Sequence, residues 1–581
     1  MTTTLRRAVP AALALLLLVG PPFVHPALAH GFGQTYDLPL PLWLYLWGAG
    51  AAVLVSFVPI SLFSGGTRKD EPYRYPRYDL LGISPLRAVL TSRALLSGLK
   101  LVSVSLFLLV VLAGFIGEQG EGYNFAPTFV WIIFWVGLSF FTAFVGNVWP
   151  QVNPWKVLFE WADGLAGGRL EMREPYPDAW GVWPAVALYA AFVWIELVFY
   201  GASLPLSISL LVLAYSVLTW SGMSVFGKGA WLRGGEAFSV YFGILGRFAP
   251  TEVRVKGSRP CRDCEACQPA KGGCVNCYEC FAAARPEERE LDLRPPAVGL
   301  VRSERPSAGG TVFVILMLAG VAYDGLLATP LWLEIVRLTP VTQTAGIFLM
   351  PLLFLAVYLG FVKLSQLAGG GGAPLRILAP AYVYTLVPIA IAYQVAHYYT
   401  YLLIQGQSII SHASDPFGWG WNLFGTAHYE PRIDLISAAF VWYSQVALIV
   451  GGHVAAVYLA HLLSLRYFAS AKLALRSQIP LLALMILYTV SSLWILSQSI
   501  VEDERAAESP ARIYLASPSQ LFLQVQPVPD VQEVAGEQRA LTGDLLVALP
   551  LVKPERGQVG AADVEADGRL AGFTGEVLGG C

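Results

Sequence analysis

The sequence predicts an all-α polytopic membrane protein with about ten transmembrane helices, a cytoplasmic cysteine-rich loop and a small polar extracytoplasmic tail. Three observations predict this class. Hydrophobic residues make up 55% of the 581 residues and charged residues only 13%, a balance that soluble domains do not show. Apolar stretches long enough to span a bilayer recur along the chain. Lysine and arginine gather in alternate loops between these stretches, as membrane topology requires.

The first 29 residues have the pattern of a secretory signal peptide. Arg6 and Arg7 precede an apolar run, and an Ala-Leu-Ala triplet ends at Ala29, which is the small-residue pattern of a cleavage site. Cleavage there leaves His30 as the first residue of the mature chain, on the outer side of the membrane. An uncleaved first anchor is the alternative.

Ten apolar stretches follow the signal, each with the length of a transmembrane helix. Five lie within residues 30–226 and five within 311–498, separated by the cysteine-rich loop 227–310 and followed by the tail 499–581. The spans are expected near residues 41–63, 100–117, 128–149, 180–201, 204–226, 311–332, 342–364, 378–404, 434–464 and 479–498.

The charge distribution orients the chain. With the mature N-terminus outside, alternation places five loops in the cytoplasm, at residues 64–99, 150–179, 227–310, 365–377 and 465–478. Of the 38 lysines and arginines, 28 fall in or beside these loops, two in the signal and six in the tail. Only Arg337 and Arg432 lie in short outside loops, so the bias favours this topology. It predicts a multi-pass plasma-membrane protein of a bacterium, with the tail outside.

Two segments near the inner surface carry local predictions. The pattern from Asn147 to Trp155, with two prolines, predicts a turn at the surface with exposed amides. The segment from Trp231 to Phe248 mixes aromatic and basic residues, which predicts an amphipathic helix lying in the inner interface.

Six cysteines give the clearest chemical signal. They form two C-x-x-C-x-x-C triads in the 227–310 loop: Cys261, Cys264, Cys267, Cys274, Cys277 and Cys280. Cytoplasmic thiols stay reduced, so metal ligation is favoured over disulfides. Two residues between thiolates let a tight turn aim both sulfurs at one ion, and Gly272-Gly273 lets the second triad fold back towards the first.

The spacing leaves the metal open. Cys264, Cys267, Cys274 and Cys277 would close a tetrahedral zinc site, with Cys261 and Cys280 as extra ligands or spectators. Alternatively, the first triad and one cysteine of the second hold an iron–sulfur cluster. The first triad resembles the start of the bacterial ferredoxin run, but its fourth cysteine follows after six residues rather than three and no proline follows it. Transient binding of copper or another soft metal is the third interpretation.

Three histidines suggest a copper site outside the membrane. A free amine and imidazole at His30 would chelate Cu(II), with His412 or His428 of the outside loop 407–432 as a further ligand. An N-terminal histidine of this kind is similar to that of copper-brace proteins, such as lytic polysaccharide monooxygenases and some periplasmic copper carriers. The alternative is that His412 and His428 are ordinary surface histidines beside the aromatic belt.

Polar residues inside the spans suggest further sites. His397 and His453 could ligate a haem between spans eight and nine, or they could belong to a hydrogen-bonded network that pins the helices together. Glu196 and Asp324 are the clearest carboxylates at membrane depth. Either could be a proton or cation site, or be paired with tyrosine and glutamine.

The sequence favours a membrane metal-handling or electron-transfer component, with the lipid bilayer and another membrane or extracytoplasmic redox protein as partners. The first alternative is a permease whose route is lined by Glu196, Asp324, His397 and His453, with a structural zinc loop. The second is a non-catalytic subunit that assembles or anchors an extracytoplasmic partner. No nucleotide-binding Walker motif and no nucleic-acid footprint are present in the sequence.

Overall fold

The computed structural model describes residue 36 and residues 38–63, 75–256, 264, 274–302, 306–330, 332 and 339–498. The predicted signal peptide, His30 and the tail lie outside the described residues. Within them, nine helices are long and apolar enough to cross a membrane, in agreement with the predicted class. The fourth of the ten predicted spans, 180–201, is the shorter helix α9 (Trp183–Leu197).

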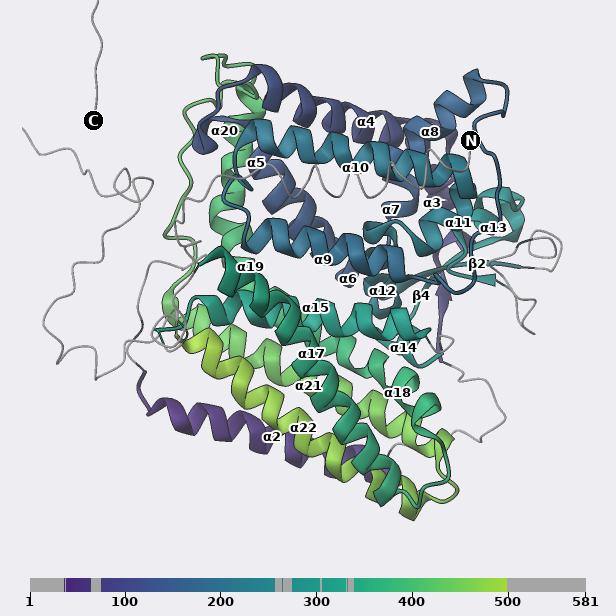
Figure 1. Ribbon diagram of the computed structural model, residues 1–581, viewed down its shortest axis with the longest axis vertical. Coiled ribbons are helices and arrows are strands. Elements are labelled where there is room, and N and C mark those ends of the chain that lie inside the picture. The colour runs from purple at the N-terminus through teal and green to yellow at the C-terminus, as the bar shows by residue number, and fades with distance from the viewer. Residues whose placement is uncertain are drawn as a thin grey trace, which may run out of the picture. The chain divides into compact units, whose positions relative to one another are not determined.

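The long helices pack side by side in a bundle (Figure 1). One span joins three short elements, α5 (Phe125–Pro127), the π-helical η3 (Thr128–Gly137) and α6 (Leu138–Phe144). Another passes from α18 (Leu375–Val383) through η5 (Tyr384–Leu386) into α19 (Val387–Ile404). The others are α2 (Leu42–Phe63), α4 (Arg93–Ile116), α10 (Pro205–Phe226), α15 (Ala308–Leu327), α17 (Pro340–Ala368), α21 (Ala438–Tyr467) and α22 (Ala471–Ser497).

Small residues let these helices approach closely. A Cβ atom on Gly452 of α21 would lie 2.4 Å from the Cβ of Ala392 and 2.8 Å from the carbonyl oxygen of Pro388, both on or beside α19. Close backbone packing at small residues is how helices associate in a membrane, where burial against lipid gives little driving force. Helix α21 also packs on α22, and α22 on α2 and α17.

All five predicted cytoplasmic loops gather at one end of the bundle, which we call the sheet end. Tyr278 donates a hydrogen bond to the carbonyl of Asn147 (2.8 Å), and Arg466 donates one to the carbonyl of Val301 (3.0 Å). Gly369 lies against the ring of Phe468, and residues 78–79 pair with 292–293. The loops that charge alternation placed on one side of the membrane therefore lie at one end of the bundle. Which side of a membrane they face stays a prediction.

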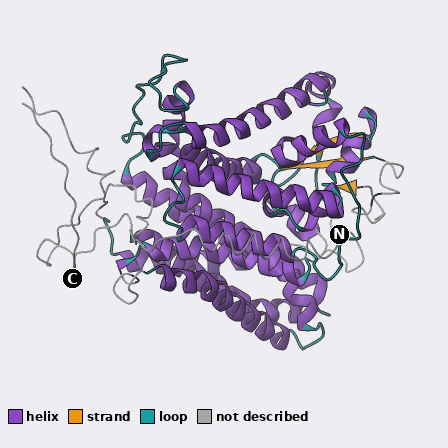
Figure 2. Cartoon of the chain, turned by 45° about the horizontal axis from the view of Figure 1, so that its top comes forward, coloured by secondary structure: helices purple, strands orange, loops and turns teal. Residues whose placement is uncertain are grey.

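A four-stranded antiparallel sheet lies at this end (Figure 2). The strand order is β1 (Tyr78–Asp79), β4 (Arg289–Leu293), β2 (Thr251–Val255) and β3 (Cys274–Val275). Its interior is charged: Arg294 has a side-chain exposure of 1% and pairs with Glu252, whose side chain is fully buried. Arg294 also donates to the carbonyls of Gly246, Arg247 and Ala249, so it fastens the sheet to the preceding helix.

Shorter helices complete the two ends. At the sheet end these are η1 (Leu80–Gly82), α3 (Ser84–Leu90), α13 (Tyr278–Ala283), η4 (Pro286–Glu288) and α14 (Val298–Arg302). At the opposite end, which we call the far end, they are η2 (Glu121–Tyr123), η6 (Gln405–Gln407) and α20 (Ser408–Ser414).

Four more helices lie where the sequence predicted a surface turn and an interfacial helix. They are α7 (Trp149–Val152), α8 (Pro154–Leu165), α11 (Lys228–Gly234) and α12 (Ala237–Phe248). Trp155 at the start of α8 packs on Phe107, midway along α4, and bonds Ser216, midway along α10. Helix α12 packs against α6, α9 and α19. Both α8 and α12 therefore begin inside the bundle, and the predicted exposed amide of Asn153 is 1% exposed.

A single carboxylate joins these two helix starts. Glu236 is fully buried and caps α12 by accepting hydrogen bonds from the backbone N–H groups of Phe238 (3.0 Å) and Ser239 (2.8 Å). It also accepts from the indole of Trp149 and the amide of Asn153, the residue that caps α8. An acidic residue at a helix N-terminus is favoured by the helix dipole, so this side chain caps α12 and joins it to the start of α8.

Candidate functional site

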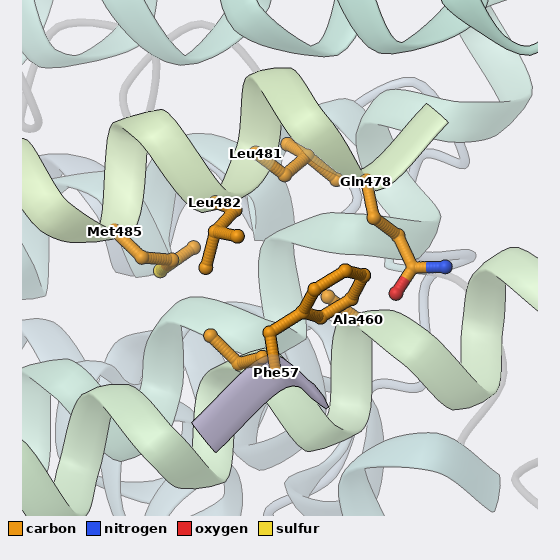
Figure 3. A pocket seen from close by; sticks show the side chains of 7 residues that line it. Phe57, Ala460, Gln478, Leu481, Leu482 and Met485 are labelled. Carbon is orange, nitrogen blue, oxygen red and sulfur yellow. The ribbon is translucent and has the colours of Figure 1, made fainter. Parts of the chain in front are cut away.

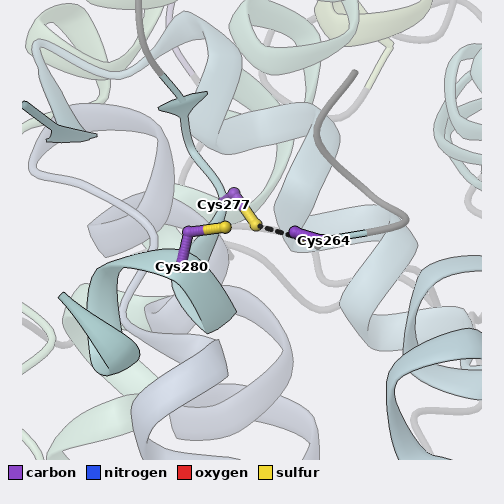
Figure 4. A group of neighbouring side chains, drawn as sticks. All are labelled: Cys264, Cys277 and Cys280. Atoms are coloured by element: carbon purple, nitrogen blue, oxygen red, sulfur yellow. Dashed lines mark hydrogen bonds between the residues drawn. The ribbon is translucent and has the colours of Figure 1, made fainter. Parts of the chain in front are cut away.

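Three cysteines lie close together at the sheet end (Figure 4). Cys264, Cys277 and Cys280 offer sulfur atoms that all lie within 4.8 Å of one another, and the sulfurs of Cys264 and Cys277 are 3.7 Å apart. Cys280 is 2% exposed, and the other two are half-buried. This group could hold a metal ion. The structure thus brings together one member of the first predicted triad and two of the second.

A tight turn positions two of these thiols. Asn276 adopts a left-handed backbone conformation (φ 55°), which asparagine tolerates better than most residues. Its backbone N–H donates to the carbonyl of Val253, and its side chain accepts from the N–H of the same residue. These two hydrogen bonds attach the turn to strand β2. The chain then passes directly into α13, with Cys277 at the helix start and Cys280 in its first turn.

Burial raises the pKa of the Cys277 thiol, and the neighbouring Cys264 raises it further, while hydrogen bonding to Cys280 opposes the shift. A metal ion binds the thiolate, so it must displace this proton. Metal affinity at the cluster should therefore fall as the pH falls.

Cys274 departs from its predicted role. It is buried on β3 and is disulfide-bonded, with a partner outside the described residues. A sulfur in a disulfide offers no thiolate, and a disulfide is not expected in a reducing compartment. Cys261 and Cys267 also lie outside the described residues. Within the described residues, the group that could hold a metal ion consists of Cys264, Cys277 and Cys280.

The sulfur spacing can be compared with the dimensions of the proposed metal sites. A tetrahedral zinc ion with Zn–S bonds of about 2.3 Å holds its sulfurs about 3.8 Å apart, which matches the 3.7 Å between Cys264 and Cys277. In an iron–sulfur cubane each thiolate binds a different iron, so the sulfurs stand further apart than around one ion. The three sulfurs of the described trio lie within 4.8 Å of one another.

The predicted copper ligands are not assembled by the described residues. His412 on α20 is 7% exposed, and its Nε2 atom lies 3.0 Å from the carbonyl oxygen of Gly122, so it is no surface histidine. His428 is exposed in the far-end loop. His30 lies outside the described residues, and the copper site stays a prediction.

The two predicted haem ligands lie at different depths. Gln445 of α21 donates to the carbonyl of Ala396, the residue before His397, and His453 is eight residues further along α21. Eight helical residues span about 12 Å, so the two imidazoles are not opposed across one site. His397 is instead 2.9 Å from the Asp324 carboxylate, and the Nδ1 atom of His453 is 2.8 Å from the carbonyl of Ile449. This geometry favours the packing-network interpretation for His453.

The two membrane-depth carboxylates do meet, which the sequence could not show. Tyr398 on α19 donates to Asp324 (2.6 Å) and lies 3.4 Å from Glu196, so its hydroxyl bridges the acids of α15 and α9. The indole of Trp135 donates to Glu196 (2.7 Å). Three of the four residues proposed for a permease route therefore form one cluster.

A small pocket lies elsewhere, between α2, α21 and α22 (Figure 3). Gln478 supplies the one amide among the lining residues, and the others are apolar: Phe57, Val457, Ala460, Leu481, Leu482 and Met485. The Gln478 carbonyl bonds the buried His461 (3.0 Å). No lining residue is acidic or a cysteine, so the pocket matches none of the predicted metal sites.

No family model, curated protein or solved structure matches this chain. The site must therefore be interpreted from its own geometry.

Proposed function

We propose that this chain is a membrane protein that binds one metal ion at Cys264, Cys277 and Cys280, and that the ion is zinc. The observation that carries the proposal is the sulfur spacing of 3.7 Å within a trio no wider than 4.8 Å. Soft thiolates at this spacing suit zinc, which prefers four sulfur or nitrogen ligands around one centre.

The surroundings support a structural role for the ion. Cys280 packs with Val255 of β2 and Ala284 in a small apolar cluster, and Tyr278 ties α13 to the loop after α6. An ion at this point would fasten α13 to the sheet and to the loop that carries Cys264. Structural zinc sites are closed, with every ligand supplied by protein. Electron transfer through an iron–sulfur cluster fits this spacing less well, and the copper and haem interpretations do not contribute to the proposal.

We expect the full chain, purified anaerobically in detergent with a mild reductant, to contain about one zinc per chain and no visible chromophore. Elemental analysis and the ultraviolet–visible spectrum measure both quantities. Cys280→Ser should lose most of the zinc, because a serine hydroxyl does not replace a buried thiolate ligand. Cys581→Ser, which changes the seventh cysteine in the tail, should keep it.

Iron with broad absorbance would contradict the zinc proposal and restore the electron-transfer interpretation. Equal zinc content in the Cys280→Ser and Cys581→Ser variants would show that the metal binds elsewhere. Omitting the reductant tests whether the disulfide at Cys274 competes with the metal, because reduction adds a thiol to the ligand set.

A further inference from the structure

Two acidic side chains share one site inside the bundle. Glu196 stands in the last turn of α9 and Asp324 in the last turn of α15. The hydroxyl of Tyr398 contacts both carboxylates, at 3.4 Å and 2.6 Å. Asp324 is 8% exposed. Two carboxylates in such contact disfavour the doubly ionised state, so the cluster needs a bound positive charge.

The helices around the cluster do not supply that charge. No lysine or arginine occurs in η3, α9, α15 or α19. The titratable groups that face the acids are His397 and four tyrosines: Tyr189 on α9, Tyr241 on α12, and Tyr393 and Tyr398 on α19. His397, 2.9 Å from Asp324, can carry one proton and balance one acid. Glu196 then has no cationic partner among the described residues.

The helix dipoles also disfavour ionised carboxylates in this cluster. The C-terminal turn of a helix carries partial negative charge and disfavours a nearby carboxylate. Both Glu196 and Asp324 occupy such turns, whereas Glu236 occupies a helix N-terminus. The two described hydrogen bonds to Glu196, from Trp135 and Tyr398, both reach Oε1. Trp135 belongs to the π-helical η3, a backbone form that recurs at functional sites.

An unpartnered hydroxyl gives a second, independent indication of a ligand. Tyr393 is 1% exposed, and its hydroxyl has no hydrogen-bond partner among the described residues. It lies against Gly325, the residue after Asp324, and its ring stacks on His397. Gln394, one residue along α19, has an unpartnered Nε2 atom within the described part of the chain and is 5% exposed. Buried groups of this kind mark places where a proton or water is exchanged.

We propose that Glu196, Asp324 and His397 form a proton-binding site, in which Glu196 takes up and releases the proton. In the loaded state Glu196 is a neutral acid and the Asp324 carboxylate pairs with the His397 imidazolium. Release converts the Glu196 carboxyl group to carboxylate, and the proton leaves to water or to a cotransported base. Such a site is what a proton-coupled permease requires. It does not depend on the zinc site, so either proposal can fail alone.

Infrared difference spectroscopy of the full chain in lipid tests this site directly. A protonated carboxyl group has its own C=O band, and we expect one that disappears between about pH 5 and about pH 9. Glu196→Gln should remove it. Glu160→Gln is the matched control, because Lys100, Lys156 and Lys228 surround that carboxylate at the sheet end and hold it ionised. The band should be unchanged in this control.

His397→Gln is expected to increase the protonated-carboxyl signal, whereas Glu196→Gln removes it. Without the imidazolium, Asp324 must also be neutral, so the protonated-carboxyl signal should rise about twofold. A wild-type chain with no such band, a band that survives Glu196→Gln, or an unchanged signal in His397→Gln would overturn the proposal. A band abolished by exchanging choline chloride for sodium chloride would also overturn it, because the ligand would then be a metal cation.

Discussion

Replacing Glu236 with alanine is expected to destabilise the bundle strongly. The carboxylate accepts six hydrogen bonds, from Trp149, Asn153 and Tyr215, from two backbone N–H groups and from the Ser239 hydroxyl. An unsatisfied buried polar group costs about 1–3 kcal/mol, and loss of a helix N-cap costs about 1 kcal/mol. For one unsatisfied donor together with the lost cap, these values predict a loss of about 2–4 kcal/mol in the free energy of unfolding.

Thermal unfolding in detergent, followed by tryptophan fluorescence, measures the effect. Glu236→Asp separates its two causes: aspartate is an equally good N-cap, but its shorter side chain should not reach Trp149 and Tyr215. Its loss of stability should be intermediate. Glu160→Gln, whose side chain contacts three partly exposed lysines, should cost less than Glu236→Ala, because those lysines can be hydrated. Equal stability of Glu236→Ala and wild type would mean that the joined starts of α8 and α12 do not hold the bundle together.

The architecture was largely predictable because it depends on local composition. Apolar length predicted an all-α membrane protein, and the described residues contain nine helices of spanning length. The cysteine spacing pointed to the thiol group that could hold a metal ion for the same reason, since ligands two residues apart belong to one turn.

Helices α8 and α12, which begin inside the bundle, were not predicted, because their stability comes from residues distant in sequence. Glu236 draws its partners from positions 149, 153 and 215, and no local pattern indicates such a set. One signal was present: asparagine at 153 followed by Pro154 is a helix start, with an N-cap and a proline at the first position. This pattern was interpreted as a turn at the surface. The apolar residues around it would have indicated a buried helix start instead.

The two acids of the carboxylate cluster were predictable from the sequence, but the contacts that join them were not. A charged residue within an apolar stretch is conspicuous, so Glu196 and Asp324 stood out singly. Their connection through Tyr398 and Trp135 depends on the packing of four elements, η3, α9, α15 and α19. Helix contacts of this kind leave no periodic mark in one sequence, since each helix is apolar all round.

Arg294→Met is expected to release the sheet from the bundle. The guanidinium lies between the buried Glu252 carboxylate and three carbonyls at the end of α12. Removing one partner of a buried ion pair costs about 3–5 kcal/mol, because the other charge stays buried. Hydrogen exchange of the β2 and β4 amides should therefore accelerate strongly. Lys256→Met is the matched control on the same sheet, since Lys256 is 54% exposed and its ion pairs contribute about 1 kcal/mol or less.

The same substitution should make the sheet more sensitive to acid. Burial alone would raise the pKa of Glu252, but Arg294, Tyr75 and Arg254 together lower it. A carboxyl group with a lowered pKa stabilises the fold above its unfolded-state pKa, and this contribution is lost as the pH falls through the folded-state value. Without Arg294 the Glu252 pKa rises, so the loss should begin at higher pH. Hydrogen exchange across an acid series measures this shift, and an unchanged midpoint would contradict it.

Arg294→Met should also weaken the proposed zinc site. The Asn276 turn, which carries Cys277 and leads to Cys280, is hydrogen-bonded to β2. Zinc dissociation from Arg294→Met, measured with a chromogenic chelator, should therefore be faster than from Lys256→Met. A metal site that folds together with its sheet transmits a loss of sheet stability into a loss of metal affinity. Equal dissociation rates, in a sheet shown by hydrogen exchange to be loosened, would mean that the thiol cluster is held by its own loop alone.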